Sequence, residues 1–518
     1  MRLPRLLALL AALAAAPVSG QSVSSSAGPE TVSVTVYRDP NRGADQPFNL
    51  RWLNGFALVT ERRTIDIPEG EADIRFEGVA GGIQPESAIV TGLPDGVVEK
   101  NQDAWLLSPG SLLDASLGRR VHIRRTSRAT GEVEETEAVI RSGAGGAVVL
   151  ETPAGIEALR CTGLPETPVY DRVPAGLSAR PTLSVRTRSR AAARATVTLS
   201  YLASGFDWQA DYIAELSPDG SRMDLFAWLT LANGDETGFV RADTQAVAGR
   251  LERQAAGRNR PQAPPIALQC WPGGTTTSDL QEYHPPVPMP PPPPAMMDIV
   301  VTGSRVARAL ESPSPITVVT AEQEELGDLK LYRIPEPVTV AAMSQKQVAL
   351  LRHERVPVDI VYRFRPGRGP DVHATLVTRN RTVERLGVPL PGGQVAFFQT
   401  GGGRRVLVGR GRLADRAVGE KVEVEIGAST DVRMVFEQEG EEREEADFSV
   451  RTFRLSVTNA KSRPVAFEAL LAEESGDLDR SLVSKGGQVA VRDGAAWWVA
   501  RLPANSTTNV RYTVHLTR

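Results

Sequence analysis

The 518-residue chain has a formal net charge of -3 at pH 7, and 41% of its residues are hydrophobic and 23% charged. This composition is ordinary for a globular protein. The near-neutral charge excludes a chain that is attracted as a whole to nucleic acid or to an anionic membrane. A chain of this length is expected to form about three domains.

The first residues have the pattern of a secretory signal peptide. Arg2 and Arg5 precede an apolar run at 6–16, and Pro17 leads into small residues that end at Gly20. The apolar run, of about 11 residues, is shorter than the roughly 20 that a membrane-spanning helix requires. We therefore expect cleavage near Gly20, a periplasmic or otherwise exported protein, and no transmembrane segment in the mature chain.

Short alternating runs of β-branched and aromatic residues follow, broken by Gly, Pro, Asn and Asp, and this pattern predicts an all-β fold. Ile65 and Ile67 alternate with polar neighbours, and the sequence PEGE at 68–71 predicts a hairpin turn before the strand that contains Ile74. We predict an N-terminal β-domain over residues 31–165.

The first part of a core β-region is predicted over residues 180–250. Val197, Leu199 and Tyr201 alternate with small polar residues and should share one face of a strand. The apolar runs on either side of 217–222 should form neighbouring strands of one antiparallel sheet.

Residues 251–328 interrupt the strand pattern. They are rich in Pro, Gln, Arg, Gly and Thr, and they include five consecutive prolines at 290–294. Such a composition predicts an extended linker with little capacity to form a core.

From residue 329 to 518 the strand pattern resumes, with turns about 8 to 12 residues apart, which favours an immunoglobulin-like β-sandwich. The predicted fold is therefore all-β: one or more N-terminal β-domains and a C-terminal immunoglobulin-like sandwich, joined through a Pro-rich linker. An acidic run at 437–448 lies between two strands around Gly440. It is interpreted as a solvated hairpin tip, with a cation site as the alternative.

Several segments together carry a family resemblance. SGFDWQADYIAELSPDG at 204–220, LYRIPEPVTVAAMSQKQVALL at 331–351 and NRTVERLGVPLPGGQVAFF at 380–398 resemble the mucoidy-inhibitor-like bacterial proteins that carry domain of unknown function 4139. The resemblance covers most of residues 31–250 and 329–518. It implies a link to envelope or exopolysaccharide behaviour and supplies no catalytic residues, and the coiled coil of longer relatives has no counterpart here.

The chain contains no recognisable catalytic motif. No G-x-S-x-G segment occurs. Zinc ligands usually include a pair at short spacing, whereas the five histidines are isolated, at positions 122, 284, 353, 373 and 515. We predict no metal, no cofactor and no enzymatic activity.

GRGRLA at 409–414 and the pair Asp207 and Asp211 each have a chemical and a structural interpretation. GRGRLA at 409–414 matches a dinucleotide-binding pattern in letters only, because no βαβ unit surrounds it, and we predict a strand with glycines. The 62 acidic residues offer many possible carboxylate pairs for a polysaccharide-active enzyme, and the pair that we name is Asp207 and Asp211, which flank Trp208. Packing of Trp208 and Tyr212 in a sheet is the competing interpretation.

The two cysteines, Cys161 and Cys270, could form a disulfide in an exported protein. The alternative is a buried thiol at Cys161 and a free thiol at Cys270.

DIVVTGSR at 298–305 resembles the TonB box of TonB-dependent receptors, and SPSPITVVTAEQ at 312–323 resembles the start of their plug domain. In those receptors the box adds as a strand to a periplasmic partner. The remaining chain is too short for a receptor barrel. The candidate partner-binding strand consists of Ile299, Val300, Val301, Thr302 and Gly303, which could pair with an envelope protein or with this chain itself.

The sequence therefore predicts an exported, non-catalytic, envelope-associated β-sandwich protein that acts as a binding or structural module. The alternatives are a polysaccharide-active enzyme and an adaptor that docks by strand addition through 298–303. Oligomeric state does not follow from the sequence.

Overall fold

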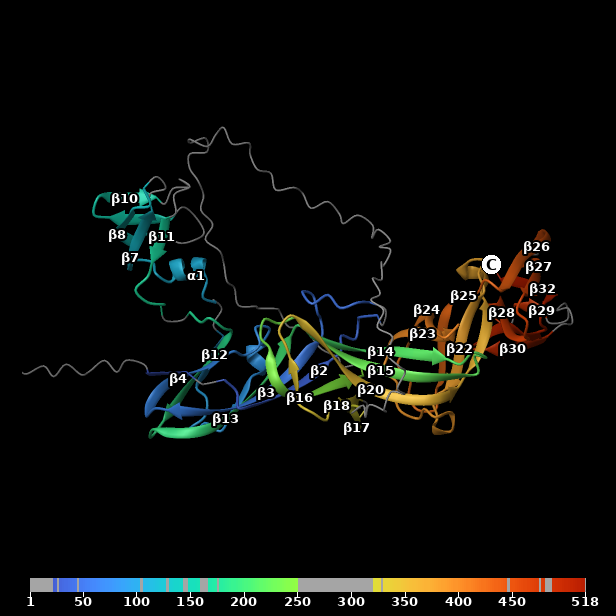
Figure 1. Ribbon diagram of the computed structural model, residues 1–518, viewed down its shortest axis with the longest axis horizontal. Coiled ribbons are helices and arrows are strands. Elements are labelled where there is room, and N and C mark those ends of the chain that lie inside the picture. Colours follow the sequence, from blue (N-terminus) through green and yellow to red (C-terminus); the bar gives the residue numbers. More distant parts are fainter. Residues whose placement is uncertain are drawn as a thin grey trace, which may run out of the picture. The chain divides into compact units, whose positions relative to one another are not determined.

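We describe a computed structural model of the chain, shown in Figure 1. It describes residues 22–25, 28–43, 46–102, 106–126, 130–142, 148–158, 166–174, 177–249, 320–327, 329–444, 448–474, 477–479 and 487–517. Strands make up 63% of the described residues and helices 4%, so the predicted all-β, multi-domain fold is confirmed. The described residues form two compact units, treated separately below: unit 1 contains those within 22–31 and 60–201, and unit 2 contains those within 32–59, 202–249 and 320–517.

Unit 1 contains a four-stranded sheet in which β4 and β12 form the central antiparallel pair. Arg186 and Arg188 on β12 lie directly opposite Asp73 and Glu71 on β4, so opposite charges face each other along the ladder. The sheet order is β1 (Ser22–Ser25), β4 (Gly70–Glu77), β12 (Thr182–Ser189) and β6 (Glu99–Gln102).

The prediction of a hairpin at 68–71 is wrong. The turn exists, with Gly70 at a φ of 92°, but it leads from β3 (Phe56–Ile67) into a different sheet. β4 pairs with β12 and β1 instead of returning along β3. The period-two pattern specifies that both segments are strands, whereas the complementary charges on β12 favour it as the partner of β4.

A second sheet of unit 1 has its own small core. Val121 and Ile123 on β7 pack with Ile140 and Leu150 on the neighbouring strands and with Leu113 from the short helix α1 (Pro109–Asp114). Its five strands, in order, are β10 (Gly155–Ala158), β9 (Val149–Thr152), β8 (Val133–Ile140), β7 (Arg120–Thr126) and β11 (Glu166–Val169).

β3 and β13 (Ala193–Ser204) are long strands whose residues are divided between the two units. As predicted, Val197, Leu199 and Tyr201 share one face of β13, where each is fully buried. The short 3-10 helix η1 (Pro85–Ser87) leads into β5 (Ile89–Thr91), which pairs with β13.

In unit 2, strands far apart in the chain pair with one another. β2 (Thr31–Tyr37) pairs parallel with β16 (Phe239–Ala248), and β16 pairs antiparallel with β18 (Leu329–Arg333). β17 (Glu322–Leu326) pairs with β18, so strand structure already begins within the predicted linker 251–328. β19 (Val338–Val340) also pairs with β16.

A five-stranded sheet forms the middle of unit 2. The predicted antiparallel neighbours on either side of 217–222 are confirmed: they are β14 and β15, paired from Phe206↔Asn233 to Leu216↔Met223. The sheet order is β20 (Ser344–Pro357), β15 (Arg222–Asn233), β14 (Phe206–Leu216), β23 (Gly393–Gly401) and β24 (Arg404–Leu413).

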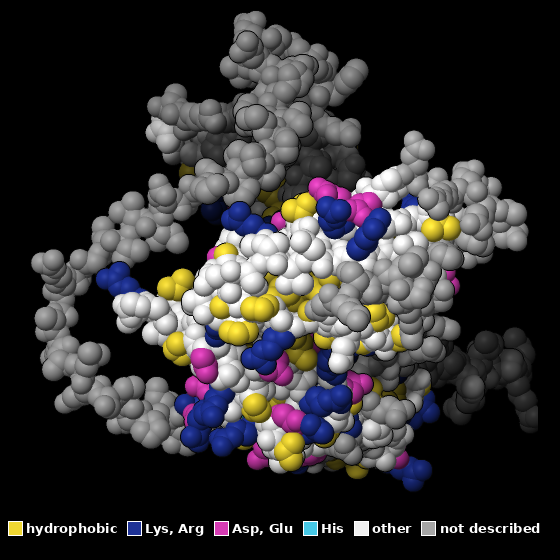
Figure 2. All heavy atoms as spheres, turned by 90° about the vertical axis from the view of Figure 1, so that its right-hand side faces the viewer, with side chains coloured by type: hydrophobic (Ala, Val, Ile, Leu, Met, Phe, Trp, Pro, Cys, Tyr) yellow, Lys and Arg dark blue, Asp and Glu magenta, His cyan; other side chains and the backbone are white. Residues whose placement is uncertain are grey.

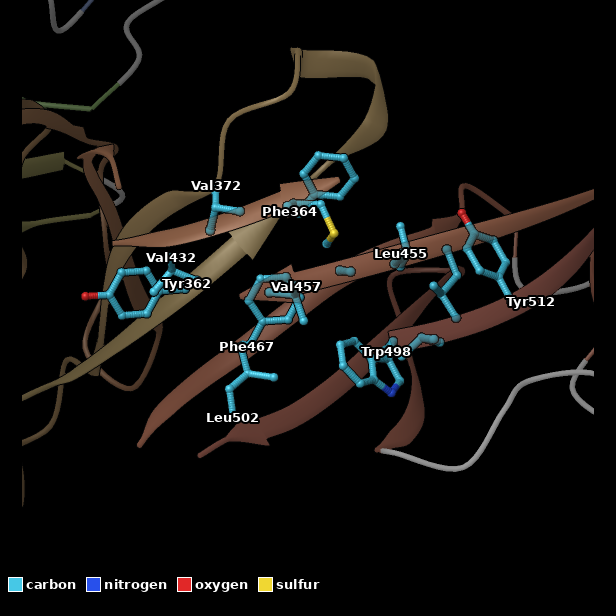
Figure 3. Close-up of a cluster of buried hydrophobic side chains, with 14 of the residues drawn as sticks. Tyr362, Phe364, Val372, Val432, Leu455, Val457, Phe467, Trp498, Leu502 and Tyr512 are labelled. Carbon is cyan, nitrogen blue, oxygen red and sulfur yellow. The ribbon is translucent and has the colours of Figure 1, made fainter. Parts of the chain in front are cut away.

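Two further sheets of unit 2 pack face to face around one core, which Figure 3 shows. Phe364, Phe467 and Trp498 of one sheet meet Leu455 and Tyr512 of the other, and all five are almost fully buried. The six-stranded sheet has the order β25 (Lys421–Ala428), β22 (His373–Arg379), β21 (Asp359–Phe364), β28 (Val465–Ala472), β31 (Ala495–Leu502) and β30 (Gln488–Arg492). The four-stranded sheet has the order β26 (Val432–Glu444), β27 (Phe448–Asn459), β32 (Ser506–Thr517) and β29 (Leu478–Asp479).

The acidic run 437–448 differs from its prediction in one respect. Gly440 is not a hairpin tip, because β26 continues to Glu444 and pairs with β27 beyond it. The register shifts between Glu439 and Arg443, and Gly440 takes a φ of 77° inside that irregularity. A glycine is suited to such a bulge because it tolerates positive φ.

Across the part of the chain described here, no helix combines the length and the apolar character needed to cross a membrane.

Candidate functional site

The candidate site lies on the outer face of the six-stranded sheet. Side chains alternate along β21, so Tyr362 and Phe364 enter the core while Arg363 points away from it. On β28 the same alternation buries Phe467 in the core and places Glu468 on the outer face, next to Arg363. The alternation of side chains along each strand therefore places these charged side chains on the outer face, away from the core.

Arg363 is held between two carboxylates. Its Nη2 atom donates to Glu423 Oε1 at 3.0 Å and to Glu468 Oε2 at 2.8 Å. The other oxygen of Glu468 accepts a hydrogen bond from Arg492 at 2.5 Å, and Lys421 lies 2.5 Å from Glu423. These groups form a fixed, mutually neutralising network.

The protonation of this network follows from its contacts. Burial acts to raise the pKa of Glu423, but hydrogen bonds from Lys421 and Arg363 outweigh it and lower that pKa to about 2. Burial likewise opposes the pKa shift of Glu468, and its bonds with Arg492 and Arg363 lower the pKa overall. Both carboxylates are therefore charged near neutral pH.

Arg365 and Arg416 differ from Arg363, because no carboxylate pairs with either of them among the residues that the structure describes. The guanidinium of Arg365 lies 5.0 Å from the ring centre of Trp497, and that of Arg363 lies 5.6 Å from the same ring. This cation-π arrangement orients Arg365 without neutralising it. The Nε atom of Arg416 is buried and has no hydrogen-bond partner, while its backbone forms two bonds of 2.9 Å with Leu390.

These side chains surround a pocket of about 270 Å³. That volume is near the lower end of ligand pockets, about 300 Å³. The lining consists of four arginines, three carboxylates, one histidine and one threonine: Arg363, Arg365, Arg368, Arg416, Asp371, Glu423, Glu425, His373 and Thr375. We call this hollow the arginine pocket.

Within the arginine pocket the remaining charges are loosely paired. Arg368 and Glu425 approach to 3.4 Å, and both side chains are largely exposed. The Nδ1 atom of His373 lies 2.8 Å from Glu425 Oε1, which is an ion pair only when the histidine is protonated. Since Arg363 is already saturated by Glu423 and Glu468, the positive groups left for a ligand are those of Arg365 and Arg416, and Asp371 is a carboxylate of the same lining.

Guanidinium groups that lack a carboxylate partner recognise anions. Their planar donors match the oxygens of carboxylate and phosphate, and they keep their charge at any physiological pH. The arrangement is therefore suited to hold an anionic group against the sheet.

The carboxylate pair considered from the sequence has another role. The Asp207 side chain is 1% exposed and accepts hydrogen bonds from Arg42 Nε at 2.6 Å, Asp39 N at 3.0 Å and Trp208 N at 2.8 Å. Burial raises the Asp207 pKa, although the bond from Arg42 acts in the opposite direction. Asp211 accepts hydrogen bonds from Gln209 and Thr230. Asp207 thus fastens the segment around Arg42 to β14, and it does not face a substrate cleft.

The competing packing interpretation of the neighbouring aromatic residues is supported by their burial. Trp208 is fully buried and donates from Nε1 to Val247 O at 2.9 Å. Tyr212 is 2% exposed and donates to Pro391 O at 2.7 Å. GRGRLA at 409–414 lies in and just after β24, which is antiparallel to β23, so the predicted strand is confirmed.

Other predicted site residues lie outside the described residues. These are the candidate strand Ile299, Val300, Val301, Thr302 and Gly303, the cysteines Cys161 and Cys270, and His284. In the described ranges, no group of three or more His, Cys, Asp or Glu side chains lies close enough together to hold a metal ion.

The residues of the arginine pocket were not singled out from the sequence. A signal does exist in RFRPGRGP at 363–370, where three arginines surround a Pro-Gly turn. Arg416 and Trp497 have no such local signal, because only the pairing of distant strands brings them to this turn.

The chain matches no protein-family model, and no curated protein is significantly similar to it.

Proposed function

We propose that this protein is an exported, non-catalytic, envelope-associated β-protein that acts as a binding module and holds anionic groups in the arginine pocket. The observation that carries the proposal is the pair Arg365 and Arg416, which line a pocket without a carboxylate partner among the described residues. Arg416 adds a buried Nε donor that has no hydrogen-bond partner, and such a donor is costly for a fold.

Export is supported by the signal-peptide pattern that ends near Gly20. The resemblance to mucoidy-inhibitor-like proteins supports a place in the cell envelope, where acidic polysaccharides and phosphate groups are the prevalent anions. A binding role agrees with the structural role of Asp207, whose burial leaves the polysaccharide-active alternative without its named carboxylate pair.

Calorimetric titration of the full chain with inorganic phosphate and with glucuronate tests the proposal. Arg365→Gln should weaken binding about 10-fold to 100-fold, because a hydrogen bond to a charged group contributes about 1.5–3 kcal/mol. Arg404→Gln is the matched control, since Arg404 is an exposed arginine on β24 that does not line the pocket. Absence of binding for both anions, or equal losses in the two variants, would overturn the proposal.

A second candidate function is docking onto an envelope partner by strand addition. The supporting observation is the β-branched run 299–302 in a segment that resembles the TonB box. Deletion of residues 296–323 should remove a partner that the full chain retains from a periplasmic extract. Retention of the same proteins by both chains would exclude this function.

A further inference from the structure

A second hollow, here called the aromatic groove, lies beside the arginine pocket. It has a volume of about 270 Å³ and is lined by residues of both sandwich sheets and of the turn after β21. Its lining is mainly apolar: Pro366, Gly367, Phe436, Phe453, Leu470, Leu471, Ala472, Tyr512 and Val514, with Glu473 and Asp477 as the charged members.

Three aromatic rings line one side of the groove, with Phe436 stacked on Phe453 and Tyr512 tilted against Phe453. The ring centres of Phe436 and Phe453 are 5.0 Å apart with an interplanar angle of 19°, and those of Phe453 and Tyr512 are 5.4 Å apart. Phe436 remains 37% exposed, although it is a large apolar side chain. On the face seen in Figure 2, hydrophobic side chains gather in a patch with Lys, Arg, Asp and Glu around it. An exposed apolar surface of this kind often marks a binding site.

The two hollows share one wall. This wall is the turn around the 3-10 helix η2 (Pro366–Arg368): Arg365 and Arg368 line the arginine pocket, while Pro366 and Gly367 line the aromatic groove. Below the turn, Leu470 of the groove is paired across the strands with Trp497, the ring that supports Arg365.

Charge is distributed unequally between the two sides of this turn. Arg365 and Arg416 carry positive charge without a described carboxylate partner in the arginine pocket, whereas the charged side chains of the aromatic groove are Glu473 and Asp477. An anionic group is therefore attracted to one side and repelled from the other. A ligand that occupies both hollows must have an anionic end and an apolar end.

We infer that the two hollows form one site for a phosphate-headed amphiphile, with its phosphate at Arg365 and Arg416 and its alkyl chain along Phe436, Phe453 and Tyr512. This inference rests on the proposed anion-binding function and specifies the ligand class. An alkyl chain suits the part of the groove formed by Leu471, Ala472 and Val514, whose side chains offer no hydrogen-bond partners.

The test compares three ligands by calorimetry on the full chain: inorganic phosphate, octyl phosphate and the uncharged octyl glucoside, each below its micellar concentration. Each buried methylene should improve affinity about fourfold. Octyl phosphate should therefore bind at least about 100-fold more tightly than inorganic phosphate if four or more methylenes enter the groove. Octyl glucoside should bind far more weakly than octyl phosphate.

Two variants separate the ends of the site. Phe436→Ser should weaken octyl phosphate at least tenfold and leave inorganic phosphate unchanged, whereas Arg365→Gln should weaken both phosphates. Val435→Ser is the matched control on β26, because Val435 is exposed, precedes Phe436 and does not line the groove. Thermal unfolding of each variant verifies that it is folded.

The outcomes distinguish the two proposals. Equal affinities for octyl phosphate and inorganic phosphate would overturn the shared site and leave the anion-binding function standing. Equal affinities for octyl phosphate and octyl glucoside would overturn the role of the phosphate in the shared site. Absence of binding for octyl phosphate, inorganic phosphate and glucuronate would overturn both the shared site and the anion-binding function.

Discussion

Glu61 and Arg63 form an ion pair that is buried in unit 1. The two side chains are 0% and 1% exposed. Arg63 donates to Glu61 Oε2 from Nε at 2.9 Å and from Nη2 at 2.5 Å, and its Nη1 donates to Glu77 O at 2.8 Å. Tyr201 donates its hydroxyl to the other oxygen of Glu61 at 2.8 Å.

Arg63→Met should destabilise the chain by about 3–5 kcal/mol, because it leaves the Glu61 carboxylate charged and buried without its cation. The double variant Glu61→Gln, Arg63→Met should recover most of that loss. The glutamine carries no charge and still offers an oxygen to Tyr201, and a buried pair is often close in stability to a neutral replacement of similar volume.

Urea unfolding followed by circular dichroism measures both free energies of unfolding, with Arg62→Met as the control. Arg62 is the exposed neighbour on the same strand, so its loss should change stability by less than about 0.5 kcal/mol. The reasoning is refuted if Arg63→Met is as mild as Arg62→Met. It is also refuted if the double variant is as unstable as Arg63→Met, since the cost would then not come from the stranded charge.

Two further predictions concern unit 2. The Glu423 pKa of about 2 lies below its ordinary value, so Glu423 contributes stability above about pH 4.5 that is lost as the pH falls toward 2. The free energy of unfolding, measured between pH 7 and 3, should therefore fall less for Glu423→Gln than for the parent. Parallel curves for the two proteins would contradict this prediction. Gly393→Ala should lower the free energy of unfolding by about 2–3 kcal/mol, because its Cβ would collide with the carbonyl oxygen of Ala210. Gly401→Ala is the control and should be nearly neutral, because nothing lies close to the position of its Cβ. Equal unfolding midpoints for the two variants would contradict the clash.

Strand positions were predictable from the sequence because burial of one sheet face imposes a period of two. Val197, Leu199 and Tyr201 illustrate this, since all three are completely buried. Strand partners were not predictable in the same way. The segment 68–71 makes a turn, yet β4 pairs with β12, a strand more than 100 residues away that matches it both in buried apolar residues and in charge.

The alternating glycines of GRGRLA were predicted to lie in a strand, but their reason appears only in three dimensions. A Cβ on Gly409 or Gly411 would collide with the backbone carbonyl oxygens of Ile426 and Glu425 on β25. The two glycines thus permit two strands to cross at close range.

The candidate site also could not be predicted from the sequence, because the pairing of distant strands brings its residues together. Arg365, Arg416 and Trp497 are separated by long stretches of chain and share no local motif. Their chemistry arises because β21, β28 and β31 pair side by side and place the turn after β21 over Trp497. The spacing of residues in the sequence therefore does not indicate this site, which is defined by arginines that lack a described carboxylate partner in the folded protein.

The parallel pairing of β2 with β16 also governs how quickly the protein can acquire its structure. Gln245 donates a hydrogen bond to Thr35, 210 residues earlier in the chain, at 2.7 Å. During synthesis β2 emerges long before β16 exists, so Val34 and Val36, which are fully buried in the folded protein, remain uncovered in the meantime. Contacts over such separations slow folding. We therefore expect β2 to need protection by chaperones in the interval between its own synthesis and that of β16.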